Sequence, residues 1–296
     1  MENKKPIMEV KKPTTYQEQL EILRSRGCKI DDEQRAIQFL RRTGYYRFSG
    51  YLVAFKQTDG NYLEGLTFDR VASICVFDQE LRALITKVVS EIEISIKSTV
   101  AYHHGHTYGS LGYSNPDSFN EKHDHYRFIE KFEAAVQNNS NSLIVRHHKK
   151  HYNGQFPIWA ATELFTMSMI SIFYADLKTD DKKAIAVDYA TDYVHFESWL
   201  HSVSVLRNIC AHHSRLYNIK FHQNPKLPRR YVKIEGMGAY SLFKQVNVLM
   251  LLYANRQEEW NNAFMLPLVA LLKKYGDAVE LGSMGFPVNW EVALTW

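Results

Sequence analysis

An apolar stripe at helical spacing runs from Phe68 to about His104 and limits the possible folds more than any other part of the chain. Its members recur every three or four residues, at Phe77, Leu81, Ile85, Val88, Ile92, Ile96 and Val100. This spacing matches the 3.6-residue turn of an α-helix and not the alternation of a strand. A helix of this length suits the spine of a helical bundle, because its stripe needs partner helices along its whole length.

Helical patterns cover most of the remaining chain and predict an all-α fold. Further helices are expected over residues 14–27 and 31–43, with Thr14 and Asp31 as their amino-terminal caps. Others are expected over residues 118–137, 158–177, 180–190, 191–217, 239–255 and 258–275. Tyr45 to Phe55 is a short aromatic segment interpreted as core, and a small hairpin is expected within Lys56 to Leu66. We divide the chain into an amino-terminal helical extension, residues 1–66, and a helical bundle with carboxy-terminal helices, residues 67–296.

The composition is that of a globular protein. Of 296 residues, 45% are hydrophobic and 13% aromatic, which is enough for a sizeable core. The longest apolar runs, residues 246–254 and 264–272, have about half the length that a membrane-spanning helix needs. Residues 1–12 lack the apolar core of a signal peptide. We therefore expect a soluble, cytoplasmic protein without a membrane partner.

Charge and cysteine usage set weaker limits. The chain has 36 Lys and Arg against 32 Asp and Glu, a formal charge of +4 that permits contact with a polyanion without requiring it. Cys28, Cys75 and Cys210 are far apart and odd in number, so we interpret them as reduced, mostly buried thiols. Histidines gather at positions 103, 104, 106, 123 and 125 but lack the fixed spacing of metal ligands. We expect no metal and no cofactor.

The segment from Leu206 to Asn218 combines an apolar stripe with side chains suited to phosphate and proton chemistry. On one continuous helix, Arg207 would lie about 140° from His212, with a shallow furrow between them. Arg offers a permanent planar cation for phosphate oxygens, and His moves protons near neutral pH. The two fit metal-independent cleavage of an RNA phosphodiester: His acts on the ribose 2′-OH or the leaving 5′-oxygen, and Arg stabilises charge on the phosphate.

The structural alternative is that Arg207 forms an ion pair at the edge of a core helix and His212 is a solvated surface residue. Spacing alone does not decide, because Arg146 and His151 have the same separation. The segment that carries Arg146 and His151 is polar on all sides, and we interpret it as a solvated basic helix. Its cations Arg146, Lys149 and Lys150 could hold an RNA backbone electrostatically. The copy at Arg207 differs because an apolar stripe runs through it.

Arg207-Asn208-x-x-x-His212 resembles the Arg-x4-6-His signature of HEPN ribonucleases. The wider chain resembles the Abi-like (AbiD/AbiF-type) proteins of bacterial abortive infection against phage. The matching segments follow one another as residues 45–51 (YYRFSGY), 77–82 (FDQELR), 157–159 (PIW) with 163–164 (EL), 207–218 and 284–290 (MGFPVNW). Within the second of these, Asp78 and Arg82 stand four residues apart and can pair on a helix. We interpret that pair as structural, with a role in holding the catalytic helix as the alternative.

The resemblance implies a HEPN-type bundle that works as a metal-independent endoribonuclease, leaving 2′,3′-cyclic phosphate and 5′-OH ends. It also implies a homodimer with two Arg-His furrows facing each other, and a phage-triggered toxin restrained by a regulatory or antitoxin RNA. Arg207 and His212 are the expected catalytic residues. The expected supporting residues are Asn208, His213, Arg215 and Tyr217, with His213 a competing candidate for the acid/base. Lys220, Arg229 and Arg230 are expected RNA contacts, with the basic helix above.

Two other functions stay open. One is a HEPN-like module that binds RNA or a protein partner in phage defence without cutting. The other is a His-rich metallohydrolase, whose activity a chelator would abolish. Cleavage of single-stranded RNA in EDTA, lost on changing His212, would separate the ribonuclease from both.

Overall fold

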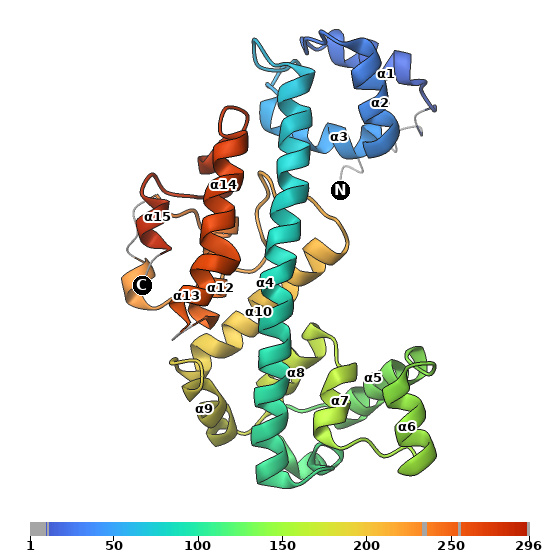
Figure 1. Ribbon diagram of the computed structural model, residues 1–296, viewed down its shortest axis with the longest axis vertical. Helices are drawn as coiled ribbons and strands as arrows, with labels where there is room; N and C mark the ends of the chain where they lie inside the picture. Colours follow the sequence, from blue (N-terminus) through green and yellow to red (C-terminus); the bar gives the residue numbers. More distant parts are fainter. Residues whose placement is uncertain (1–9, 11, 233–235, 254–255, 295–296) are drawn as a thin grey trace, which may run out of the picture. The chain divides into compact units, whose positions relative to one another are not determined.

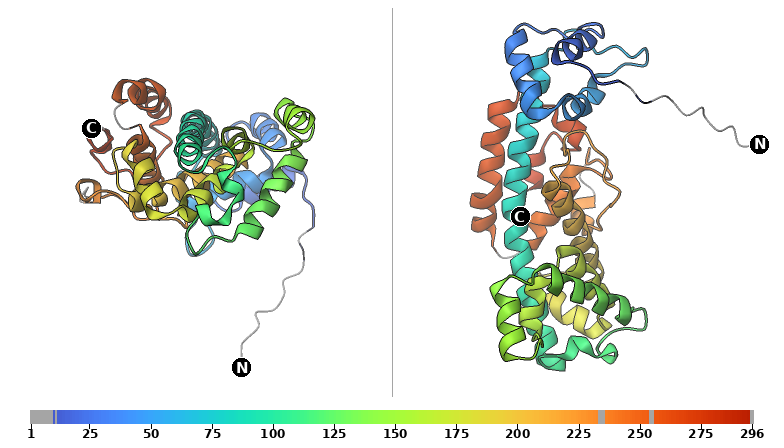
Figure 2. Two further views of the ribbon diagram at one scale, coloured as in Figure 1. Left: turned by 90° about the horizontal axis from the view of Figure 1, so that it is seen from below. Right: turned by 90° about the vertical axis from the view of Figure 1, so that its right-hand side faces the viewer.

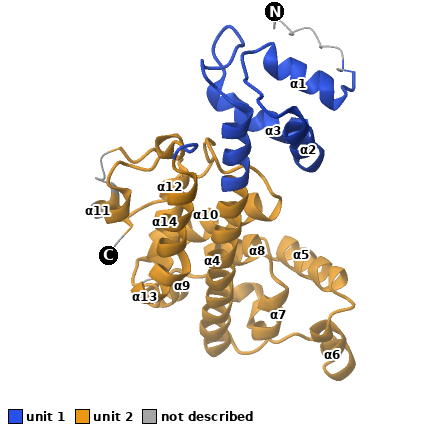
Figure 3. Ribbon diagram, turned by 45° about the horizontal axis from the view of Figure 1, so that its top comes forward, with its two compact units in different colours: residues 1–77, 277–279 blue, residues 78–276, 280–296 orange. Residues whose placement is uncertain are grey.

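The computed structural model describes residues 10, 12–232, 236–253 and 256–294, and it has the predicted all-α fold (Figure 1). Within these residues, β structure is limited to isolated bridges. One bridge joins Lys56 to Tyr62, so the expected hairpin is present as a short hydrogen-bonded turn. The chain divides into two compact units, residues 1–77 with 277–279, and residues 78–276 with 280–296 (Figure 3).

The described part of the first unit contains three short helices and the first turns of a fourth. These are α1 (Tyr16–Arg24), α2 (Glu33–Thr43), α3 (Tyr45–Leu52) with the 3-10 turn η1 (Val53–Phe55), and the start of α4. Thr15 and Asp32 cap α1 and α2, each one residue after the cap expected from the sequence. Phe48 stacks on Phe68 at a centroid distance of 4.5 Å. Tyr46, which was predicted to be core, is 93% exposed.

Helix α4 (Phe68–Tyr108) is the predicted spine, and its 41 residues make a rod of about 60 Å. The part from Asp78 onward belongs to the second unit. There, α12 (Leu242–Leu252) and α14 (Leu266–Tyr275) run beside it (Figures 1 and 2). Polar contacts join them: the Tyr253 hydroxyl donates to Glu91 at 2.6 Å and Lys274 to Glu80 at 2.8 Å.

Shorter helices follow α4. They are α5 (His125–Asn138), α6 (Leu143–His151), α7 (Ile158–Leu164), α8 (Met167–Asp176) and α9 (Thr179–Val187), with the 3-10 turns η2 (Gly112–Ser114) and η3 (Pro116–Ser118) before α5. The single helix predicted over 158–177 was wrong. Phe165 is extended and buried, and the Thr166 side chain caps α8 by accepting the Met169 N–H. The chain therefore turns between α7 and α8 at Phe165, whose ring is buried at this turn.

Helix α10 (Tyr193–Ala211) lies at the centre of the second unit and packs against α8, α9 and α12. Its predicted apolar stripe is confirmed, because Phe196, Trp199, Val203, Leu206 and Cys210 are each at most 5% exposed. The remaining elements are α11 (Arg229–Val232), α13 (Gln257–Trp260), the π-helical turn η4 (Asn261–Met265), the 3-10 turn η5 (Leu281–Met284) and α15 (Trp290–Ala293). A search of the described residues found no helix that combines the length and apolarity needed to cross a membrane.

Candidate active site

Helix α10 ends at Ala211, six residues before the predicted end at Tyr217. His213 adopts a left-handed conformation with φ of 54°, and its N–H donates to the Cys210 carbonyl at 3.0 Å. The Ser214 N–H donates to the Ile209 carbonyl at 2.9 Å. These two bonds form a Schellman motif, which terminates a helix by satisfying its last carbonyls. His212 is therefore the cap of the helix, and a continuous helical surface through Arg215 is not formed.

Two buried charged residues of α4 hold the segment beyond this cap. Asp78 Oδ1 accepts the backbone N–H groups of Leu216 and Tyr217 at 2.9 and 2.7 Å. Arg82 forms an ion pair with Asp78, and its Nη1 donates to the Ser214 carbonyl at 3.3 Å. Asp78 is 0% and Arg82 6% exposed. The pair thus fixes the backbone that follows α10, a structural role that also supports the candidate site.

Arg207 lies on the last turns of α10 with its side chain 40% exposed. Its Nε is 3.5 Å from Glu93 Oε2 on α4, and the other carboxylate oxygen of Glu93 is 3.0 Å from Lys97 Nζ. Within the described part of the chain, the two Nη groups of Arg207 have no hydrogen-bond partner. One edge of the guanidinium is therefore oriented by α4, and the terminal fork remains able to bind an anion.

His212 is exposed, and its backbone N–H donates to the Asn208 carbonyl at 3.0 Å. The Asn208 side chain turns toward α8, where Nδ2 donates to Ser168 Oγ at 3.4 Å. Ser168 in turn shares a hydrogen bond of 2.8 Å with Ser204. The Asn208 amide is therefore tied to α8, and its main-chain carbonyl is the group that contacts His212.

The other predicted supporting residues lie in different surroundings. The Tyr217 ring is 1% exposed, and its hydroxyl accepts the Glu280 N–H at 3.2 Å, so this side chain belongs to the core. Arg215 is half-buried, and His213 and Lys220 are exposed. Near the end of α10, the accessible side chains among the predicted site residues are thus Arg207, His212 and His213.

The predicted RNA contacts are spread over separate elements. Arg146, Lys149 and Lys150 are exposed on α6, a helix that buries only Val145. Arg229 is exposed at the start of α11. The loop before it is tied to α10 because the Trp199 indole donates to the Lys226 carbonyl at 2.7 Å, about 20 Å along the helix from His212. The side chain of Arg230 lies outside the described residues.

The histidines and cysteines have distinct environments. Among the described residues, no group of three or more His, Cys, Asp and Glu is arranged to hold a metal ion. Burial lowers the pKa of His104 to about 4, and its two ring nitrogens find no hydrogen-bond partner among the described residues. Cys28, Cys75 and Cys210 are buried and form no disulfide, as predicted. Burial raises the pKa of Cys28 to about 11 and that of Cys210 to about 12.

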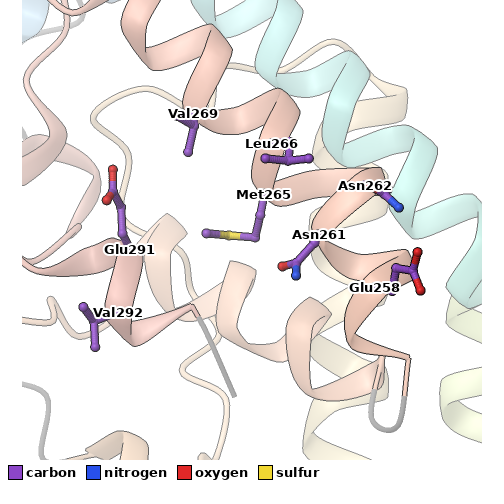
Figure 4. Close-up of a pocket in the computed structure, with 8 residues that line it drawn as sticks. All are labelled: Glu258, Asn261, Asn262, Met265, Leu266, Val269, Glu291 and Val292. Atoms are coloured by element: carbon purple, nitrogen blue, oxygen red, sulfur yellow. The ribbon is translucent and has the colours of Figure 1, made fainter.

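A pocket of about 630 Å³ beside η4 offers a different kind of surface. Its walls carry apolar, acidic and amide side chains, and Figure 4 shows the Met265 side chain pointing across it toward α15. The residues that line it are Glu258, Asn261, Asn262, Met265, Leu266, Val269, Glu291 and Val292. This pocket lacks a cation for phosphate and an imidazole for proton transfer, so it does not match the chemistry of the α10 cap.

The second unit is thus an all-α bundle that carries an accessible cation and two accessible imidazoles at the fixed end of a buried helix. A model of the family described as Abi-like protein matches residues 38–218, more than half of the chain. The chain therefore belongs to the Abi-like protein family. This membership associates the protein with abortive infection, a defence against phage. No curated protein and no solved structure matches the chain.

Proposed function

We propose that this Abi-like protein is a metal-independent endoribonuclease of HEPN type, related to the AbiD/AbiF group, with Arg207 and His212 as its catalytic residues. The observation that carries the proposal is the cap of α10. There, an exposed imidazole follows an arginine whose terminal fork has no partner in the described part of the chain. A permanent cation together with histidine, the residue type that most often transfers protons in catalysis, fits in-line cleavage of RNA by its own 2′-OH.

In this reaction His212 takes the proton of the ribose 2′-OH or gives one to the leaving 5′-oxygen. The new bond joins the 2′-oxygen to phosphorus, the bond to the 5′-oxygen breaks, and Arg207 stabilises charge on the phosphate. The products carry 2′,3′-cyclic phosphate and 5′-OH ends. Arg146, Lys149, Lys150, Lys220 and Arg229 are the described cations proposed to hold the RNA backbone. Arg230 is proposed from the sequence alone.

The reaction needs both an acid and a base, which a second copy of the chain can supply. We therefore include a homodimer with facing α10 caps in the proposal, together with a cytoplasmic toxin held off by a regulatory RNA. His213 is the alternative second imidazole within one chain. Its left-handed backbone turns it away from the direction that a helical residue would take.

The test is cleavage of end-labelled single-stranded RNA by the purified full chain in EDTA. Arg207→Ala and His212→Ala should each lower the rate by roughly 10²–10⁴-fold, the usual contribution of a positioned acid or base. The matched control is His151→Ala, which removes the exposed imidazole of the equally spaced pair on α6. Unchanged cleavage by both α10 variants, or its complete loss in EDTA, rejects the proposal.

The ion pair between Arg207 and Glu93 gives a specific reason for a second candidate, a module that binds RNA or a protein partner without cutting. An arginine oriented by a carboxylate on a neighbouring helix can serve as a fixed anion contact without any chemistry. This second candidate is supported if the protein binds RNA without producing 5′-OH ends and if Arg207→Ala weakens that binding.

A further inference from the structure

A separate pocket of about 250 Å³ is formed by α8, α5 and the residues before α5. Its apolar part consists of Phe128, Met169 and Ile172, of which Ile172 is 47% exposed. This volume lies just below the range of roughly 300–1,000 Å³ typical of drug-sized ligands. The pocket therefore suits a small ligand with a flat apolar part.

Three cations border this apolar surface. Lys122, Arg127 and Lys131 line the pocket with exposed side chains. Within the described part of the chain, none of the three side chains has an ion pair or hydrogen bond. Cations without a protein partner that surround one concavity favour an anion there, because no competing contact must first be broken.

The two carboxylates of the pocket are both engaged by the protein. Asp124 caps α5 by accepting the Arg127 N–H at 3.0 Å. Asp176 accepts a hydrogen bond of 2.9 Å from Nδ1 of His123, whose side chain is 2% exposed. These contacts satisfy part of each carboxylate, which reduces its repulsion of an anion in the pocket.

A chain of hydrogen bonds continues from Asp176 through the two histidines. His123 Nε2 lies 3.2 Å from His125 Nδ1, and His125 Nε2 lies 3.1 Å from the Ser114 carbonyl. The two imidazole rings thus connect the end of α8 to the turn that precedes α5.

The walls of the pocket are held together by the polypeptide backbone. Asn120 donates from its N–H to the Asp176 carbonyl at 2.8 Å, and from its side chain to the carbonyls of Ala175 and Leu177 at 3.0 and 3.1 Å. Its Oδ1 accepts the Lys122 N–H at 2.9 Å. The end of α8 and the approach to α5 thus form one clamp, and a pre-formed pocket loses little entropy when a ligand binds.

We infer that this pocket binds a nucleotide, with the base against Phe128, Met169 and Ile172 and the phosphate among Lys122, Arg127 and Lys131. The nucleotide comes either from the free pool or from one residue of an RNA strand. A base has a flat apolar face that can pack against the apolar part of the pocket, and a phosphate supplies a negative charge that pairs with the three cations. The inference goes beyond the proposed ribonuclease and does not depend on His212.

Binding of adenosine 5′-monophosphate to the full chain, measured by titration calorimetry, tests the site. Because both parts of the pocket contribute, the nucleotide should bind at least about tenfold more tightly than adenosine or inorganic phosphate alone. The affinity for the nucleotide should also fall with added salt, because the lysine and arginine side chains proposed to contact the phosphate are exposed to solvent. Equal binding of inorganic phosphate, or no saturable binding of the nucleotide, overturns the inference.

Matched variants locate the binding. Lys131→Glu and Ile172→Glu should each weaken the nucleotide by about tenfold or more, since they place a negative charge beside the phosphate or under the base. Both side chains are exposed, so the variants should fold, which circular dichroism checks. The controls are Lys87→Glu and Ile94→Glu, which make the same changes at exposed positions of α4. Equal weakening by the controls contradicts the assignment.

A competition experiment separates the two sources of nucleotide. An adenosine pentanucleotide is added to the complex in a His212→Ala background, which keeps the RNA intact if the chain is a ribonuclease. Displacement of the mononucleotide assigns the pocket to an RNA residue, and no displacement assigns it to a free nucleotide. If the wild-type chain binds the nucleotide but never cuts RNA, the proposed function fails and this inference stands.

Discussion

Replacing Asp78 with asparagine removes one charge from the buried pair that fixes the end of the candidate site. In the native protein the carboxylate accepts two backbone N–H groups and pairs with Arg82, and neither side chain is more than 7% exposed. Asparagine can keep its oxygen toward Leu216 and Tyr217, but its amide N–H₂ then faces the Arg82 guanidinium. The variant therefore buries a cation without a counter-charge.

The expected cost follows from this geometry. Breaking a buried ion pair by neutralising one partner typically costs about 3–5 kcal/mol, most of it from the charge left behind. Two charge-assisted hydrogen bonds also become neutral ones, and their weakening is part of this cost and not an addition to it. We expect Asp78→Asn to lower the free energy of unfolding by about 3–5 kcal/mol, measured by urea denaturation followed by circular dichroism.

A double-mutant cycle with Arg82→Met tests the explanation. Removing both charges leaves no unpaired cation, so the double variant should be more stable than the sum of the single effects predicts, by about 1–3 kcal/mol. Hydrogen exchange at the Leu216 and Tyr217 amides should accelerate in Asp78→Asn. Additive single effects, or a loss below about 1 kcal/mol for Asp78→Asn, would refute a buried charge pair that anchors this segment.

Two further changes probe buried and strained histidines. Because burial lowers the pKa of His104 from 6.5 to about 4, the unfolded chain binds a proton before the folded one does. His104 should therefore cost the protein up to about 3 kcal/mol of stability as the pH falls from about 6.5 to about 4, and none of this loss occurs above that range. His104→Phe should remove this loss of stability at low pH. At neutral pH it should raise the free energy of unfolding by about 1 kcal/mol, because no unpaired ring nitrogen stays buried. Urea denaturation at several pH values measures both effects, and an unchanged pH profile would contradict the role given to His104. His213→Gly should raise the free energy of unfolding by about 1 kcal/mol, because glycine adopts a positive φ without strain. Lost RNA cleavage in that variant, with His212 intact, would move the acid/base role to His213.

The sequence was sufficient for features that depend on local periodicity. The stripe from Phe68 to His104 predicted helix α4 almost to its observed end at Tyr108, and the apolar face of α10 is buried as expected. Caps at Thr15 and Asp32 were predicted to within one residue. These features could be predicted because helical spacing and capping involve residues that are close together along the chain.

Only the tertiary structure decided where α10 ends and what surrounds its last residues. The local pattern favoured a helix through Tyr217, and histidine is not the usual residue for a left-handed cap. The cap is accompanied by hydrogen bonds from Asp78, which lies more than 130 residues earlier in the chain. The pairing of Arg207 with Glu93 and of Asn208 with Ser168 is equally non-local. Sequence spacing could identify these side chains, but their environment depends on packing between distant helices, which no local pattern records.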